Sequence, residues 1–125
     1  MEVTLEKEDN VAKMIFASIY PHYLKRVEKN GRTKEELDLV IKWLTGYDEH
    51  ALHALIEEQV TFRTFFEKAE INTNAHLVKG VVCGYRIEEI GDEFYVYQQC
   101  RRMEKLIDEL AKGRKMEKIL RNADH

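Results

Sequence analysis

The chain has 125 residues, 34% of them charged, and a net charge of −3. This length fits one domain that buries a core without a metal or a disulfide to hold it. The weakly acidic balance gives the chain no general attraction to nucleic acid or acidic membranes, and no apolar run approaches the roughly 18 residues of a membrane span. Residues 1–10 are too acidic for a signal peptide, so we expect a cytoplasmic protein without a membrane partner.

Two antiparallel helices are predicted near the start of the chain. Ser18 is a candidate N-cap for a helix that carries Pro21 in its first turn and ends at Asn30 and Gly31. Thr33 then begins a T-x-x-E capping box, and apolar residues at core-facing spacing follow it until Gly46. The two-residue link makes these helices neighbours.

Four further helical segments complete the pattern. Asp48 and Thr61 are candidate N-caps of a third and a short fourth helix. Residues 94–112 carry apolar side chains on one side of a long helix, and residues 116–120 suggest a last short one. Residues 1–13 and 122–125 are expected to be frayed.

The segment from Leu77 to Ile90 is the most continuously apolar part of the chain and contains Gly80 and Gly84. Its apolar residues at 77, 78, 81, 82 and 85 fall on one face of a helix, which is the interpretation we favour. Both glycines disfavour a helix, so the alternative is a short buried strand over 81–83. The sequence therefore predicts an all-α fold, a single compact domain of about six helices over residues 1–125.

Four segments in the same order resemble a known bacterial family, the one catalogued as domain of unknown function 2200. The resemblance covers residues 14–121, and it implies a small bacterial protein without an assigned activity. The chain departs from the family pattern after Ile90, where G-D-E-F-Y-V-Y replaces a segment that typically begins with an acidic residue and proline. The matching segments are F-A-S-I-Y-P-H-Y (16–23), W-L-T-G-Y (43–47), G-V-V-C-G-Y-R-I-E-E-I (80–90) and L-I-D-E-L-A-K-G-R-K-M-E-K-I-L-R (106–121).

Aromatic side chains with a histidine, a thiol and an arginine form the candidate ligand site. Antiparallel packing of the first two helices places the start of one beside the end of the other, which predicts a cleft at one end of the bundle for a small anionic molecule. The alternative is that the aromatic rings belong to the core and that Arg86 pairs with Glu88, Glu89 or a neighbouring helix. The candidate residues are Tyr20, His22, Tyr23, Trp43, Tyr47, Cys83, Tyr85 and Arg86.

The sequence assigns no catalytic residue, metal or cofactor. Cys83 and His22 are the one nucleophile and base that an enzyme would use, but their proximity is unknown and a lone cysteine on an apolar stripe usually packs. His50, His53 and Glu57 lie on adjoining helix faces, yet they lack a zinc motif and sit among glutamates. We therefore expect a non-catalytic binding or interaction module.

Two other partners follow from charge and aromatic content. Residues 101–121 hold eight Lys or Arg against four acids, so this segment is +4 while the remainder is −7. It defines the alternative function of nucleic-acid binding, although most such segments are solvated faces with internal ion pairs and we do not expect a nucleic-acid partner. The aromatic residues of the segment from Phe94 to Tyr97 predict a homodimer or partner contact.

Overall fold

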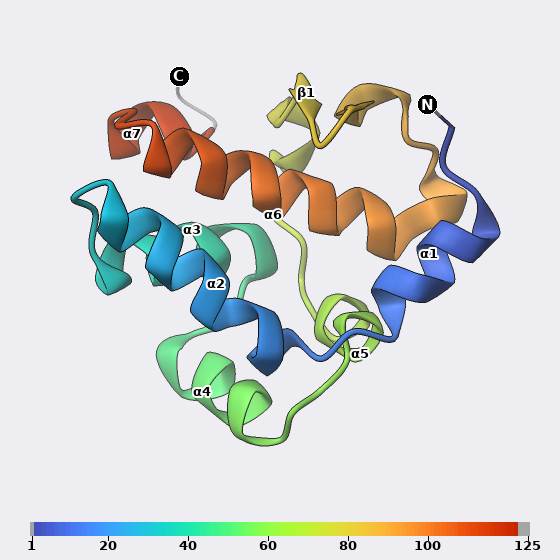
Figure 1. The fold of residues 1–125 in the computed structure, drawn as a ribbon, viewed down its shortest axis with the longest axis horizontal. Helices are drawn as coiled ribbons and strands as arrows, with labels where there is room; N and C mark the ends of the chain where they lie inside the picture. The colour runs from blue at the N-terminus through green and yellow to red at the C-terminus, as the bar shows by residue number, and fades with distance from the viewer. Residues whose placement is uncertain (1, 123–125) are drawn as a thin grey trace.

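The computed structural model describes residues 2–122, which form one compact, mainly helical domain (Figure 1). The fold is all-α, as predicted, apart from a two-stranded antiparallel sheet. In chain order the elements are α1 (Leu5–Ala12), α2 (Phe16–Lys29), α3 (Lys34–Thr45), α4 (Glu49–Glu57), α5 (Phe62–Glu67), η1 (Ala75–Leu77), β1 (Val81–Val82), β2 (Tyr85–Arg86), η2 (Ile87–Glu89), η3 (Asp92–Phe94), α6 (Tyr95–Ala111) and α7 (Met116–Ile119).

The long helix α6 is the element against which most of the others pack. It contacts α1, α2, α3 and α5, and it also contacts β1 and η2. In Figure 1 the helices α2 to α5 lie below α6, and the hairpin of β1 and β2 lies above it. Because α6 is covered on more than one side, Cys100, Met103 and Leu106 along its length are all buried.

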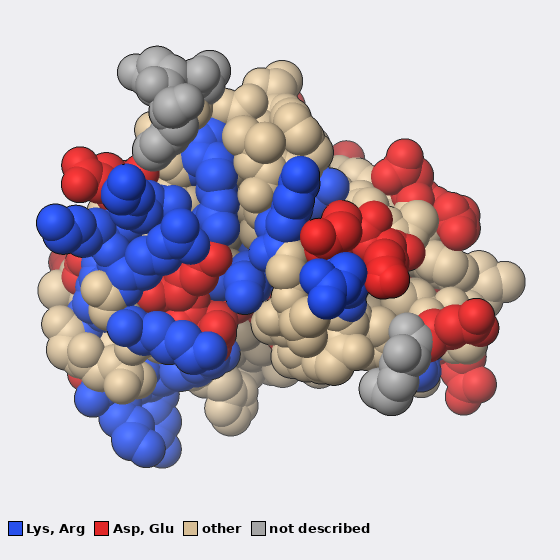
Figure 2. Space-filling model, turned by 90° about the horizontal axis from the view of Figure 1, so that it is seen from above, with Lys and Arg blue, Asp and Glu red and all other residues tan. Residues whose placement is uncertain are grey.

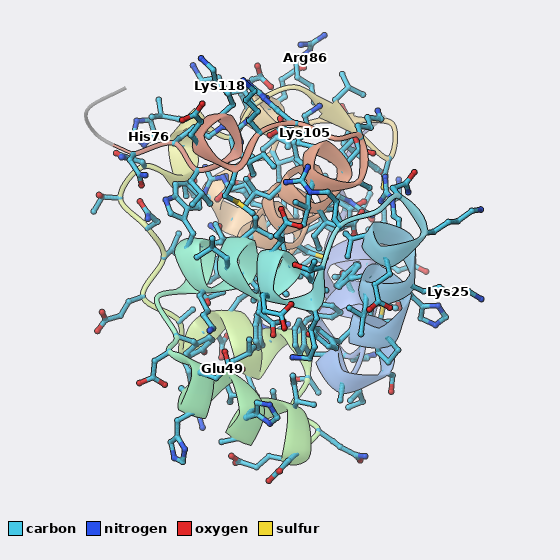
Figure 3. The ribbon with its side chains drawn as sticks, turned by 90° about the vertical axis from the view of Figure 1, so that its left-hand side faces the viewer. Lys25, Glu49, His76, Arg86, Lys105 and Lys118 are labelled. Carbon is cyan, nitrogen blue, oxygen red and sulfur yellow. The ribbon has the colours of Figure 1, made fainter. Side chains whose placement is uncertain are left out.

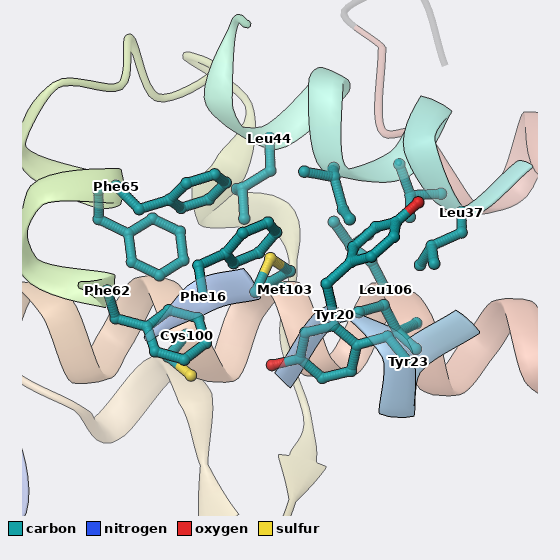
Figure 4. Close-up of a cluster of buried hydrophobic side chains, with 14 of the residues drawn as sticks. Phe16, Tyr20, Tyr23, Leu37, Leu44, Phe62, Phe65, Cys100, Met103 and Leu106 are labelled. Carbon is teal, nitrogen blue, oxygen red and sulfur yellow. The ribbon is translucent and has the colours of Figure 1, made fainter. Parts of the chain in front are cut away.

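Four phenylalanines form the centre of the core between α2, α5 and α6. Phe16 stacks nearly parallel on Phe65, with ring centroids 4.0 Å apart, and meets Phe62 edge-on at 5.8 Å (Figure 4). Phe66 packs edge-on to Phe65 at 5.1 Å. Each of these rings is at most 1% exposed. Full burial of an aromatic ring contributes about 1.5–3 kcal/mol, so this cluster is a main source of stability.

The helix ends of the first half follow the predicted caps. Both bonds of the capping box between Thr33 and Glu36 are present. Gly46 ends α3 in the left-handed conformation, with φ +76°. Asp48 accepts a hydrogen bond from the Ala51 amide, and Thr61 caps α5 in the same way. Side-chain oxygens satisfy amides that a helix start leaves unpaired, which explains why local sequence places these boundaries.

The start of α2 differs from the prediction. The helix begins at Phe16 rather than after Ser18, so Pro21 lies inside it. The backbone of this entry pairs with the residues before α5: the Phe16 amide donates to the Val60 carbonyl at 3.0 Å, and the Phe62 amide donates to the Met14 carbonyl at 2.8 Å. Tertiary pairing, which no local pattern reveals, therefore sets this boundary.

Residues 5–12, which we expected to be frayed, form α1. Thr4 caps this helix by accepting from the Lys7 amide. The Glu8 carboxylate is buried and accepts a 2.6 Å hydrogen bond from the Tyr97 amide in the first turn of α6. A carboxylate at a helix start satisfies an unpaired donor and complements the helix dipole, so this contact ties α1 to α6. At the other terminus, residues 123–125 lie outside the described residues.

The glycine-containing segment forms a hairpin, and the prediction of a helix there is wrong. Val81 pairs with Arg86 and Val82 with Tyr85. Cys83 and Gly84 form the two-residue turn, with φ +54° and +83°. A turn with positive φ at both central residues matches the twist of a tight hairpin and normally selects Asn-Gly or Asp-Gly. The alternative of a strand over 81–83 was nearer, although Val81 is exposed rather than buried.

Candidate functional site

A single carboxylate lies beneath the hairpin turn and collects three donors. Glu104 on α6 accepts from the Cys83 thiol at 2.9 Å, from the Cys100 thiol at 3.5 Å and from Arg101 Nη1 at 2.7 Å. Cys83 is exposed at the turn, whereas Cys100 is buried. Glu104 therefore anchors a short hairpin that has few backbone bonds of its own.

The thiols in this network are poorly suited to nucleophilic chemistry. Burial, followed by the hydrogen bond to Glu104, raises the pKa of Cys83, and burial raises the pKa of Cys100 further. A catalytic cysteine needs the opposite shift, which a histidine or another cation beside it supplies. His22 lies exposed on α2, and the hydrogen bond of Cys83 goes to a carboxylate instead. The geometry does not support Cys83 with His22 as nucleophile and base.

A second network joins α1, the hairpin and α6. Lys7 donates from Nζ to the Tyr85 hydroxyl at 2.7 Å, and this bond lowers the pKa of Tyr85. The Tyr85 ring packs edge-on to Tyr97, with centroids 5.4 Å apart. Arg101 lies over the Tyr97 ring at 4.6 Å and donates to its hydroxyl at 3.0 Å. These contacts fix the position of Tyr85 and so restrain the hairpin against α1 and α6.

A hollow of about 500 Å³ lies beside the hairpin. Three segments line it: the chain before α1, the hairpin, and the link from η2 to α6. Its apolar lining includes Val3, Val81, Ile90 and Phe94. Pockets for small ligands in proteins are commonly of this size, with an apolar lining and a few polar groups.

The charged groups of the hollow are mostly acidic. Glu2, Glu89 and Glu93 line it together with one cation, Arg86. Arg86 Nε lies 3.9 Å from a Glu89 oxygen, and both side chains are exposed, so this pair is weak. The Glu93 carboxylate lies directly over Gly91, where an added Cβ would collide with it. The net charge of these four side chains is −2, which is opposite to what an anionic ligand needs.

The aromatic candidates of the first two helices lie in or at the edge of the core. The Tyr20 hydroxyl donates to the buried Asp38 carboxylate, and burial raises the pKa of Tyr20. The Tyr47 hydroxyl donates to the Phe65 carbonyl at 2.5 Å, and burial raises the pKa of Tyr47 to about 12. The rings of these two tyrosines lie in or beside the core, which agrees with the alternative interpretation of the sequence, and their hydroxyls bond to protein groups.

The other candidates are dispersed. Trp43 is half-buried, and its Nε1 donates to Asn122 at 3.1 Å. Tyr23 is buried, and its pKa is raised by burial first and then by Cys100 and Glu104. Of the eight candidate residues, all within the described chain, only Tyr85 and Arg86 line the hollow.

The aromatic residues at the start of α6 are largely covered by the protein itself. Tyr97 is 3% exposed, and the Tyr95 hydroxyl donates to the Phe66 carbonyl at 3.0 Å. Phe94 is half-buried and lines the hollow. The excess of exposed aromatic area on which the expected homodimer rests is therefore absent over residues 94–97, and the dimer stays a prediction for light scattering.

Several residues of this region escaped the sequence analysis. Glu104 lies three positions after Arg101 and four after Cys100, the spacings that bring side chains together on a helix, so local spacing could have found these residues. Glu2 and Glu93 are 91 positions apart and meet at the hollow only because α1 packs on α6. No local signal predicts such a meeting.

Residues 2–122 contain neither a metal-binding cluster nor a membrane-spanning helix. No group of three or more His, Cys, Asp or Glu in this range has an arrangement that could hold a metal ion. No helix in the same range is long and apolar enough to cross a membrane. On α4, His53 lies 3.9 Å from Glu49, at the solvent-exposed surface.

The fold and this region define a small helical protein in which a hairpin covers one side of a central helix. Residues 10–121 match the family described as an uncharacterized protein conserved in bacteria, DUF2200, and the chain belongs to that family. The crystal structure of an uncharacterized protein, SP1917, is similar to it, with 34% identity and a TM-score of 0.84 over 94% of this chain and 95% of that one. No curated protein matches the chain.

Proposed function

We propose that this protein is a non-catalytic binding module whose ligand occupies the hollow beside the hairpin. The observation that carries the proposal is that a hollow of about 500 Å³ is lined both by apolar residues and by three glutamates, here called the acidic rim. Such a site suits a small molecule that carries an amine or guanidinium group next to an alkyl or aromatic part. The raised pKa of Cys83, which does not line the hollow, disfavours this thiol as a nucleophile.

The net negative charge of the residues that line the hollow leads us to propose a cationic ligand in place of the anionic one that we expected. That expectation assumed that Arg86 is free to hold a carboxylate or phosphate through two parallel hydrogen bonds. Arg86 instead lies 3.9 Å from the Glu89 carboxylate, and Glu2 and Glu93 line the same hollow. A bound cation replaces part of the mutual repulsion of the three glutamates with attraction, whereas a bound anion adds to it.

Paired probes of opposite charge and similar shape test the proposal. We expect phenethylamine to raise the thermal unfolding midpoint and 3-phenylpropionate to leave it unchanged. A ligand at 100 times its dissociation constant adds about 2.7 kcal/mol to the free energy of unfolding, so millimolar binding is detectable at high probe concentration. Stabilisation by the carboxylate and not by the amine contradicts the proposal.

Two variants in the hollow have opposite expected effects. Glu93→Gln removes an attractive charge and should weaken the amine, while Arg86→Ala removes a repulsive charge and should strengthen it. Glu58→Gln, an exposed glutamate at the end of α4, is the matched control and should change nothing. If Arg86→Ala abolishes amine binding, or if the control acts like Glu93→Gln, the ligand does not sit where we propose.

A further inference from the structure

A second surface, separate from the hollow, is strongly basic. Seen from above, lysine and arginine side chains gather over the half of the molecule that contains α7 (Figure 2). A smaller group of acidic side chains is visible among them, and further acidic side chains lie toward the end where the chain begins. Lys105 and Lys118 are both on this upper side, whereas Lys25 projects from a different side (Figure 3).

Two carboxylates on α6 hold four of the cations in place. Asp108 pairs with Arg26 and with Lys112, the latter at 3.0 Å. The side chain of Asp108 is 15% exposed and that of Lys112 is 74% exposed. The carboxylate therefore lies below the surface, and the cation stands above it.

Glu109 repeats this arrangement one residue further on. It pairs with Arg114 at 2.9 Å and accepts from Arg121 at 2.7 Å. The side chain of Glu109 is 10% exposed against 45% for Arg114 and 15% for Arg121, so Arg114 stands above the carboxylate while Arg121 is buried beside it. An ion pair with a buried acid and an exposed base leaves a positive potential toward solvent. The pair also restricts the conformations of the long basic side chain before a partner binds.

Other lysines on this surface have no acid to neutralise them. Among residues 2–122, no ion pair joins Lys105, Lys115 or Lys118 to an acid, and Lys105 donates a hydrogen bond to the Val81 carbonyl at 3.4 Å. Together with the four held cations this makes seven bases against three acids, a net charge of +4 on one surface of a protein whose total is −3. The three acids are Asp108, Glu109 and Glu117.

We infer that this surface, the α6–α7 basic face, binds the phosphate backbone of duplex nucleic acid without sequence preference. It is defined by Arg26, Lys105, Lys112, Arg114, Lys115 and Lys118, and the largely buried Arg121 adds to its charge. Cations that are held in place and outnumber the nearby acids can neutralise phosphates. From the sequence we did not expect a nucleic-acid partner; the structure favours this alternative because Asp108 and Glu109 lie below the cations that they bind, whereas Glu117 stays exposed.

Composition separates duplex nucleic acid from two related partners. Membrane-surface binding combines basic side chains with an exposed apolar face. The large hydrophobic side chains exposed in the described chain lie outside α6 and α7, and Val81, whose carbonyl accepts from Lys105, borders the basic face as a single apolar side chain. Single strands are held by stacking on aromatic rings, and residues 101–122 contain none. Backbone contact with a duplex needs neither.

Fluorescence anisotropy with a 20-base-pair duplex of mixed sequence tests the inference. If about four phosphates are neutralised, the logarithm of the binding constant falls with the logarithm of salt with a slope of about −3.6. Affinity should then decrease by about 100-fold between 50 and 200 mM salt. Absence of binding at 50 mM, or binding that does not respond to salt, overturns the inference.

Substitution of exposed lysines locates the contact. Lys115→Gln with Lys118→Gln should reduce the slope by about 2, because two phosphate contacts are lost. Lys13→Gln with Lys68→Gln removes the same charge from exposed sites outside α6 and α7 and should lower affinity much less. Equal effects of the two pairs overturn the inference, as does binding to anionic vesicles without binding to the duplex. The unfolding midpoint of each variant verifies that it is folded.

Discussion

Removing the charge of Glu109 on α6 should lower the free energy of unfolding far more than removing the charge of the adjacent Asp108. Glu109 accepts hydrogen bonds of 2.7 and 2.8 Å from both terminal nitrogens of Arg121, whose side chain is 15% exposed. Breaking a buried ion pair costs about 3–5 kcal/mol, because the remaining charge has lost both water and its partner. This site is not fully dry and glutamine still accepts one bond, so for Glu109→Gln we expect about 2–3 kcal/mol.

The neighbouring residue provides the matched comparison. Asp108 binds Lys112, which is 74% exposed, and Arg26, which is also exposed. Solvent hydrates these cations when the carboxylate is removed, so Asp108→Asn should cost less than about 1 kcal/mol.

Urea denaturation measures the difference directly. With a slope of about 1.5 kcal/mol per molar, Glu109→Gln should lower the midpoint by about 1.3–2 M and Asp108→Asn by less than about 0.7 M, at an unchanged slope. Raising the salt concentration should reduce only the smaller loss, since the exposed pairs are screened. Equal losses for the two variants would refute the reasoning that burial of the partner decides the cost.

Two more predictions concern the hairpin and the end of α3. Glu104 helps to raise the pKa of Cys83, so iodoacetamide should alkylate this exposed thiol more slowly than free cysteine at pH 8. Glu104→Gln should accelerate the reaction, and equal rates in the two proteins would count against the hydrogen bond between Cys83 and Glu104. Gly46→Ala forces an alanine into the left-handed conformation and brings its Cβ to 2.8 Å from the Glu70 carbonyl oxygen, so it should lower the free energy of unfolding by about 2–3 kcal/mol. Gly31 is also left-handed, but no atom lies within 4 Å of an added Cβ, so Gly31→Ala should cost about 1 kcal/mol. Calorimetry that ranks the two glycine variants in the reverse order would show that the backbone at Gly46 yields.

The parts of the fold that follow from nearby residues were predictable. The capping box at Thr33 and the caps at Asp48 and Thr61 each use a side chain within three residues of the amide that it satisfies. The long helix also followed, because its apolar residues repeat at helical spacing over seventeen positions.

The hairpin was not predictable in the same way. Val81, Val82 and Tyr85 occupy positions that suit a helix face, and a Cys-Gly dipeptide is a weak signal for a turn with two positive φ angles. The start of α2 failed for a related reason, since Ile15 pairs with Thr61 across the chain. Long-range pairing outweighs local propensity in both places.

The candidate site was predictable only in part. Tyr85 and Arg86 are neighbours in the sequence and both line the hollow, whereas the other six candidate residues do not, because they come from separate helices or from the hairpin turn. The charge of the lining depends on Glu2 and Glu93, which come from distant parts of the chain. The charge of the hollow therefore could not be predicted from the sequence.

Titration of the isotope-labelled protein with phenethylamine, followed through its amide resonances, tests the central claim most directly. The account predicts that the largest shifts occur at Gly84, Gly91 and Phe94, which border the hollow, and that α4 and α7 stay still. Shifts concentrated on α4 or α7, or no shifts from the amine beside clear shifts from 3-phenylpropionate, would contradict it.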